Sequence, residues 1–185
     1  MLLTKLTKNN KGGAVIFFAL MLTLLFSSIL IIVLDTTHVM KVSRDLDLAL
    51  DLATKAASAQ LNWEEVYNGN FIIDVNNAPA TFRDIFERNF LRRGQTGYVL
   101  TEPFQWQYEF IDPTTRNVLT IFIEVQNDPQ PTGFILGDAR HNAIIPPTNN
   151  PVVAAFGVVR YNRVGMWNTG PVYLRRVAVS QLTVN

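Results

Sequence analysis

Residues 13–34 read GAVIFFALMLTLLFSSILIIVL and contain no charged side chain. At 1.5 Å of rise per residue, an α-helix of this length crosses a hydrocarbon layer of roughly 30 Å. The alternative is a core helix, but a small domain cannot enclose so long an apolar helix on every side. The run therefore predicts one transmembrane segment over residues 13–34.

The charges on either side of this run predict its orientation. Lys5, Lys8 and Lys11 precede it without an acidic residue among them, whereas the segment just after it carries both signs. Because positively charged flanks stay in the cytoplasm, residues 1–12 are expected to form a cytoplasmic basic leader. The sequence thus predicts a single-pass membrane protein whose C-terminal part is extracytoplasmic.

Two places along this anchor bear on proteolytic processing. No small-x-small site follows Leu34, so the pattern of a cleaved secretory signal is missing on the outer side. Gly12, Gly13 and Ala14 lie at the cytoplasmic boundary, where prepilin-type leaders are cut. Small residues that merely begin a helix are the other interpretation of these three positions.

The helical pattern continues beyond the membrane segment. After Asp35, apolar residues recur at steps of three and four, which places them on one face of a helix. They are Val39, Val42, Leu46, Leu50, Ala53, Ala57 and Leu61. No Gly or Pro interrupts residues 14–61, so one helix of about 48 residues would be roughly 70 Å long, more than twice a bilayer core. Residues 35–61 are therefore expected to project from the membrane, with a narrow apolar stripe that fits another helix or a sheet.

Residues 62–185 are expected to form an extracytoplasmic α+β domain. Phenylalanines on one face predict a short helix over residues 79–93. β-Branched and aromatic runs predict strands at 71–75, 104–110, 118–125, 151–161 and 172–184, the second and third of which form a hairpin. Residues 126–150 are rich in Pro, Asn and Gly and read mostly as loop, with a short strand at 134–136. The fold class is α+β, with a mainly antiparallel sheet of about four to five strands.

Composition and motifs give no sign of catalysis. The formal net charge of +1 supplies no general attraction to nucleic acid, and the absence of cysteine excludes disulfides and thiolate metal sites. The two histidines, His38 and His141, stand far apart in the sequence. Gly-x-Ser-x-Gly, phosphate-loop and paired-His motifs are missing. We predict no enzyme, no cofactor, and no catalytic or metal-binding residue.

The N-terminal third of the chain resembles a known family. Residues 13–20 (GAVIFFAL) begin a long apolar stretch, Asp35 ends it, and an alanine-rich helix continues. In this order the features resemble the TadE/TadG-like pilus-assembly proteins, which are pseudopilins of the type IV filament superfamily. The resemblance departs at two positions: Phe17 stands where that family usually has Glu, and Thr23 where it usually has Pro.

The resemblance implies a pilin-like domain in a structural subunit of a Tad-type pilus or a related secretion system. Such a minor pilin or pseudopilin acts by helix packing without turnover, at the cell surface or in a pilus. Its partners would be the lipid bilayer and other pilin-like subunits or pilus-assembly components, with no nucleic acid. With Phe17 in place of Glu, an uncut minor component or accessory is also implied. The residues expected in helix packing are Phe17, Phe18, Leu20, Asp35, Val39, Val42, Leu46, Leu50, Ala53 and Ala57.

An alternative function is that of a membrane-tethered, exported binding module. Residues 126–150, together with the aromatic residues of 104–110, would then form a surface that recognises an extracellular ligand. Asp138, Arg140 and His141 are a tight group of titratable residues within this stretch. A polar loop rim explains them as well as a binding site does.

Overall fold

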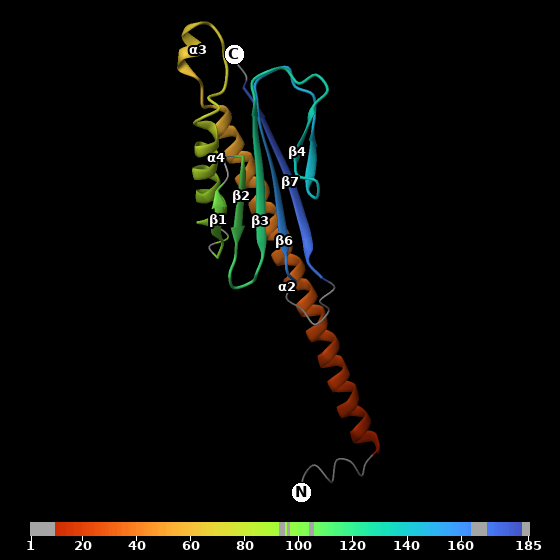
Figure 1. The fold of residues 1–185 in the computed structure, drawn as a ribbon. Helices are drawn as coiled ribbons and strands as arrows, with labels where there is room; N and C mark the ends of the chain where they lie inside the picture. Colours follow the sequence, from red (N-terminus) through yellow and green to blue (C-terminus); the bar gives the residue numbers. More distant parts are fainter. Residues whose placement is uncertain (1–9, 93–94, 96, 104–105, 164–169, 183–185) are drawn as a thin grey trace.

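The computed structural model describes residues 10–92, 95, 97–103, 106–163 and 170–182 (Figure 1). Its helical elements are α2 (Asn10–Ser58), α3 (Trp63–Tyr67), α4 (Ala78–Phe86) and the π-helical turn η1 (Glu87–Leu91). Its strands are β1 (Val99–Pro103), β2 (Gln107–Ile111), β3 (Val118–Gln126), β4 (Phe134–Gly137), β5 (Asn142–Ile145), β6 (Val152–Tyr161) and β7 (Val172–Gln181). The predicted α+β class is therefore confirmed.

The long helix α2 is continuous over 49 residues. It ends at Ser58, three residues before the predicted end, because the chain then turns and Leu61 forms an isolated antiparallel bridge with Ile73. This bridge is all that forms of the strand predicted at 71–75, so that prediction was wrong. The side chain of Asn127 occupies both backbone groups of Ile73, accepting from its N–H at 2.8 Å and donating to its carbonyl at 2.9 Å.

Five strands form the main sheet in the order β1-β2-β3-β6-β7, and every neighbouring pair is antiparallel. The predicted hairpin is confirmed as β2 and β3, and the two C-terminal strands as β6 and β7. The edge strand β1 was not predicted. Neither was β5, which pairs with β4 in a separate two-stranded hairpin. That hairpin corrects the expectation that residues 126–150 are mostly loop, and it confirms the short strand at 134–136.

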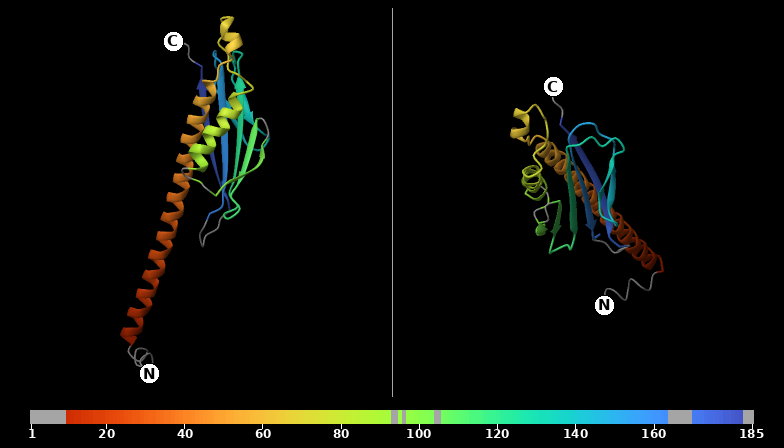
Figure 2. Two further views of the ribbon diagram at one scale, coloured as in Figure 1. Left: turned by 90° about the vertical axis from the view of Figure 1, so that its left-hand side faces the viewer. Right: turned by 45° about the horizontal axis from the view of Figure 1, so that its top comes forward.

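The elements are stacked in three layers. The helices α2 and α4 cover one face of the main sheet, and the β4–β5 hairpin covers the other (Figures 1 and 2). The interior strand β6, between β3 and β7, is consequently buried on both faces. Val153, Ala155 and Val159 belong to the cluster on the helix side, while Phe156 and Val158 belong to the cluster under the hairpin. Burial on both faces explains why β6 reads as an unbroken apolar run.

The short helix after residue 78 supplies an aromatic wall to the helix-side core. Phe82, Phe86 and Phe90 are fully buried, and successive rings stack at centroid distances of 6.0 and 5.2 Å. Pro79 lies in the first turn, where its missing N–H costs nothing. The helix predicted over 79–93 is thus confirmed through Leu91, and Arg93 lies outside the described residues.

Close approach of α2 to the sheet depends on Gly157 in β6. A Cβ placed there would lie 3.0 Å from Leu50 Cδ1 and 3.1 Å from Leu46 Cδ1, which is tighter than ordinary van der Waals contact. The alanines of α2 act in the same way from the other side, since Ala49, Ala53 and Ala57 are all fully buried. Small residues on both elements let the helix lie directly on the strands.

Candidate functional site on the long helix

The outer half of α2, residues 42–57, is part of the domain core. Val42, Leu46, Leu50, Ala53 and Ala57 are each at most 1% exposed. They contact β6, β7 and α4 of the same chain. The sequence left open whether this stripe packs against another helix or a sheet, and the structure places it on the chain's own sheet. Residues 42–57 therefore belong to the same packed unit as the domain that follows.

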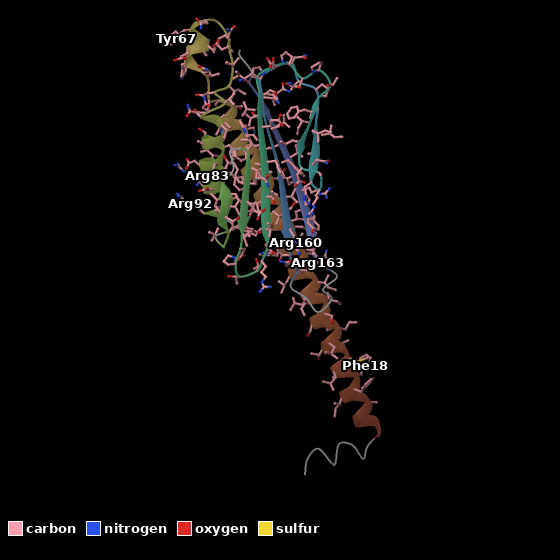
Figure 3. The ribbon with its side chains drawn as sticks, viewed as in Figure 1. Phe18, Tyr67, Arg83, Arg92, Arg160 and Arg163 are labelled. Carbon is pink, nitrogen blue, oxygen red and sulfur yellow. The ribbon has the colours of Figure 1, made fainter. Side chains whose placement is uncertain are left out.

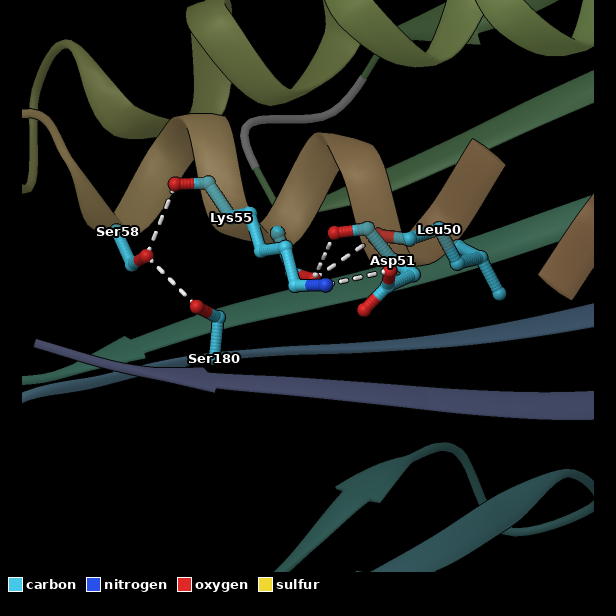
Figure 4. Close-up of polar contacts among 6 residues, drawn as sticks. Leu50, Asp51, Lys55, Ser58 and Ser180 are labelled. Atoms are coloured by element: carbon cyan, nitrogen blue, oxygen red, sulfur yellow. Dashed lines mark hydrogen bonds and ion pairs between the residues drawn. The ribbon is translucent and has the colours of Figure 1, made fainter. Parts of the chain in front are cut away.

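Polar contacts also fix the outer half to the last strand. Ser58 Oγ lies 2.8 Å from Ser180 Oγ of β7, in a hydrogen bond that either hydroxyl can donate (Figure 4). Arg176 of β7 donates to Ser43 Oγ further down the helix. On the exposed side, Lys55 and Asp51 form an ion pair at 2.8 Å, with both side chains about half exposed or more. Exposed pairs of this kind contribute little to stability, so apolar burial dominates here.

The inner half of α2, residues 12–34, is exposed where the outer half is buried. Phe17, Phe18 and Leu20 are 65%, 70% and 60% exposed, and the helix extends away from the domain over this half (Figure 3). Among the described residues, α2 is the one helix long and apolar enough to cross a membrane, and its most apolar window has no buried residue. A candidate membrane span near the N-terminus fits the prediction of a single-pass membrane protein.

Several polar side chains in and just after this apolar half donate to carbonyls of their own helix. Thr23 Oγ1 donates to the Ala19 carbonyl at 2.9 Å, and Ser28 Oγ donates to the Leu24 carbonyl at 2.8 Å. Thr36 bonds the carbonyl four residues before it in the same way. Unsatisfied donors are costly in hydrocarbon, so these back-bonds make the surface compatible with lipid.

Asp35 marks the junction between the two halves. Its side chain is 15% exposed, and Oδ2 lies 3.7 Å from Arg163 Nε, which follows β6. Its Oδ1 is buried and has no hydrogen-bond partner among the residues that the structure describes. Burial and the Asp35 carboxylate both raise the pKa of Tyr161, whose ring lies 5.6 Å from that of His38. Val39, one turn further, is partly buried against the core, so the helix enters the domain at this point.

The residues considered for processing lie in the first turns of α2. Gly12 is half-buried, while Gly13 and Ala14 are exposed. Within the described residues, no atom outside the local helix lies within 4 Å of a Cβ built on Gly13. Gly13 is thus sterically open with respect to the described residues, and cleavage at these three positions stays a prediction.

The titratable residues Asp138, Arg140 and His141 form the turn between β4 and β5. Asp138 Oδ1 accepts the backbone N–H groups of Arg140 and His141 at 2.7 and 2.6 Å, which closes the β4–β5 hairpin. These hydrogen bonds, that from His141 foremost, lower the pKa of Asp138. Gly137 adopts φ +121°, a conformation that favours glycine. Within the described part of the chain, no three His, Asp or Glu residues gather as metal ligands.

A cleft of 730 Å³ lies beside the hairpin, between β3 and β4. Its apolar lining residues are Val75, Trp106, Phe122, Ile123, Val125, Ile135 and Leu136, and its polar ones include Gln107, Glu124, Gln126 and Asp138. Of the aromatic residues predicted to form a recognition surface, Trp106 lines this cleft. Tyr108 and Phe110 are instead buried toward the helices, and Phe104 lies outside the described residues.

The geometry defines an α+β protein with an antiparallel five-stranded sheet and one candidate membrane-spanning helix near its N-terminus. Comparisons with protein-family models, curated proteins and solved structures found no match. The sequence alone did not indicate that Arg163 and Tyr161 lie near Asp35. Tyr161 ends β6 and Arg163 follows it, so no local pattern links them to the helix.

Proposed function

We propose that this chain is a pilin-like structural subunit, a minor pilin or pseudopilin of a Tad-type pilus or related secretion system. Its N-terminus would lie in the cytoplasm and its domain outside. One observation carries the proposal: a single unbroken helix is domain core over residues 42–57 and bare apolar surface over residues 12–34.

This arrangement suits assembly better than tethering. A tether needs only enough apolar residues to cross the bilayer and works as well through a flexible linker. Here no linker separates anchor and domain, so the helix fixes the orientation of the domain relative to the anchor. Helices in lipid associate through close packing of their surfaces. A rigid helix-and-domain unit with an uncovered helix surface is the form that stacks in a regular array.

A single-cysteine scan over residues 17–34 of the full chain tests this proposal. The protein has no native cysteine, so every disulfide reports the introduced residue. With a membrane-permeable oxidant in native membranes, dimers should form at positions that recur every three to four residues, which marks one helix face. Uniform absence of dimers at all positions contradicts an assembly role.

Two further measurements address the leader and Phe17. Mass spectrometry of the mature N-terminus reads Met1 if the leader is kept, and Gly13 or Ala14 if a prepilin-type peptidase acts. Intact Met1, together with no co-purifying pilus component, contradicts the filament part of the proposal. Phe17→Glu restores the residue that the resembled family keeps, and we expect it to increase incorporation into a filament.

The second candidate function, an exported binding module, is favoured by the cleft beside the hairpin. Its aromatic and carboxylate lining is of the kind that binds small ligands. Screening the detergent-solubilised full chain should then give a specific ligand, with binding lost in Trp106→Ala and kept in Tyr67→Ala. Any soluble version must retain α2 from about residue 36, because truncation at residue 62 removes Leu46 and Leu50 from the core.

A further inference from the structure

The end of the domain farthest from the N-terminus exposes three aromatic side chains. Trp63 and Tyr67 stand one turn apart on α3, and they are 65% and 88% exposed. Phe71 follows at 44% exposed, held near them because Asn70 N–H donates to the Glu65 carbonyl at 2.9 Å. We call these three residues the distal aromatic patch. Exposed aromatic groups gathered at one end of a domain mark a contact surface.

The charged residues of the segments beyond the end of α2 that surround this patch are all acidic. The segments that form this end are residues 59–77, 127–132 and 146–151 (Figure 1). They contain Glu64, Glu65, Asp74 and Asp128 and no lysine or arginine. Glu64 is exposed and makes no side-chain hydrogen bond or ion pair among the described residues. Aromatic rings flanked by carboxylates favour cationic groups, arginine above all.

The opposite end of the domain carries arginines. Arg116 lies in the β2–β3 turn, Arg160 near the end of β6, and Arg163 just after it, and all three are exposed. We call them the basal arginine cluster. Asn162 joins the segments, since its Nδ2 donates to the Thr115 and Arg116 carbonyls at 3.1 and 2.8 Å. Tyr67 lies at one end of the domain and Arg160 and Arg163 at the other (Figure 3).

The nearby carboxylates pair with only one of the three arginines in this cluster. Asp112 is occupied by its own turn, where it accepts from the N–H groups of Thr114 and Thr115 and from the Thr115 hydroxyl. Asp35 faces Arg163. Within the described part of the chain, Arg116 and Arg160 form no ion pair, so two positive charges are left for another molecule.

We propose that the distal aromatic patch of one copy binds the basal arginine cluster of a second copy displaced along the helix axis. This contact rests on the proposed function, because two copies at the same depth in one membrane cannot bring opposite ends together. An offset of about one domain height, roughly 33 Å for the ten residues of β6, brings them into contact. Anionic lipid headgroups could also face the arginines, but they would leave the distal patch unexplained.

Disulfide cross-linking of the full chain in intact cells of the native host, where displaced copies can assemble, tests this contact. Asn68→Cys lies next to Tyr67, and Thr114→Cys lies in the turn of Arg116, so the pair leaves every proposed contact residue intact. The double variant should give a ladder of dimers, trimers and larger species on oxidation, because each copy carries both ends. The matched control pairs Asn68→Cys with Ile135→Cys, an exposed position on the hairpin, and should give no ladder.

Charge reversal distinguishes recognition from chance collision. Arg160→Glu in the double-cysteine background should lower the ladder by about tenfold, and Glu64→Arg added to it should restore most of the loss. Loss without restoration contradicts the pairing. Dimers from Asn68→Cys alone, with no ladder, would mean that distal ends meet each other and would also overturn it.

The single-cysteine scan over residues 17–34 distinguishes failure of this proposal from failure of the proposed function. Dimers in the helix without a ladder overturn the end-to-end contact and leave the structural role standing. If neither the helix dimers nor the ladder form, both the end-to-end contact and the structural role are contradicted. If the ladder is absent and Arg160→Glu instead weakens flotation with phosphatidylglycerol vesicles, while phosphatidylcholine vesicles show no change, the arginines bind lipid and the proposal fails.

Discussion

The two halves of α2 are equally helical and both apolar, yet they face different surroundings. Over residues 13–34 the apolar side chains surround the helix, and those of its most apolar window are all outside the domain. Over residues 42–57 one face carries a stripe of leucine, valine and alanine that is buried, while Leu48 and Leu52 lie outside it and are exposed. The difference teaches that the width of the apolar surface, more than its hydrophobicity, decides whether a helix faces lipid or a sheet.

The largest effect is expected where the outer half meets the sheet. Leu50→Ala should lower the free energy of unfolding by about 2–5 kcal/mol, because it removes a fully buried side chain and leaves a cavity. Leu48→Ala is the control, since Leu48 is 50% exposed and should change stability by less than about 0.5 kcal/mol. Urea unfolding of the full chain in detergent measures both. Equal losses of stability in Leu50→Ala and Leu48→Ala would contradict the assignment of Leu50 to the buried stripe and Leu48 to the exposed surface.

The inner half should respond in membrane insertion instead. Leu24→Arg places a charge near the middle of the apolar run, at a cost of about 2.5–3.5 kcal/mol in insertion. We expect more of the protein to be extracted from membranes by alkaline carbonate, with unchanged urea unfolding of the domain. Leu24→Ile is the conservative control. A destabilised domain in Leu24→Arg would show that the inner half also supports the core.

Filling the space at Gly157 sharpens the contrast further. Gly157→Val should destabilise the domain by about 1–3 kcal/mol, since its side chain would collide with Leu46 and Leu50. Gly13→Val in the inner half meets open space and should leave unfolding unchanged. Combining Gly157→Val with Leu46→Ala should cost less than the sum of the two changes, because the smaller side chain makes room. If the destabilisations of Gly157→Val and Leu46→Ala simply add, the contact between these two positions is contradicted.

The smallest effect compares two serines on the same helix. Ser58→Ala removes the hydrogen bond to Ser180 of β7 and should cost about 0.5–1.5 kcal/mol in urea unfolding. Ser28→Ala removes only a bond to the helix's own backbone and should leave domain stability unchanged. If Ser28→Ala were the more destabilising change, the assignment of the two halves would be reversed.

Much of the fold could be predicted because its signals are local. The 22 uncharged residues, the three-four spacing of the stripe and the runs of β6 and β7 each specify an element without reference to the rest. The strands β1 and β5 escaped prediction because they are short and carry polar residues or proline. They are strands because β2 and β4 supply their hydrogen-bond partners.

The site was harder to predict because its contacts are distant in sequence. The stripe was evident, but nothing in residues 35–61 says whether it packs against another subunit or against β6. The partner of Asp35, Arg163, lies beyond the end of β6 and has no motif that connects it to the helix. Pairing between elements so far apart follows from the completed topology.

The contact between α2 and β7 has a consequence for biogenesis. Ser58 and Ser180 are 122 positions apart, so the first and the last elements of the domain pack against each other. If the domain lies outside the cytoplasm as proposed, the helix reaches the outer side before any strand does, and its stripe stays uncovered until nearly the whole chain has crossed. Contacts between such distant segments slow folding and prolong the exposure of apolar surface. In the proposed orientation, residues 42–57 would therefore need temporary shelter during export, either at the bilayer surface or on a chaperone.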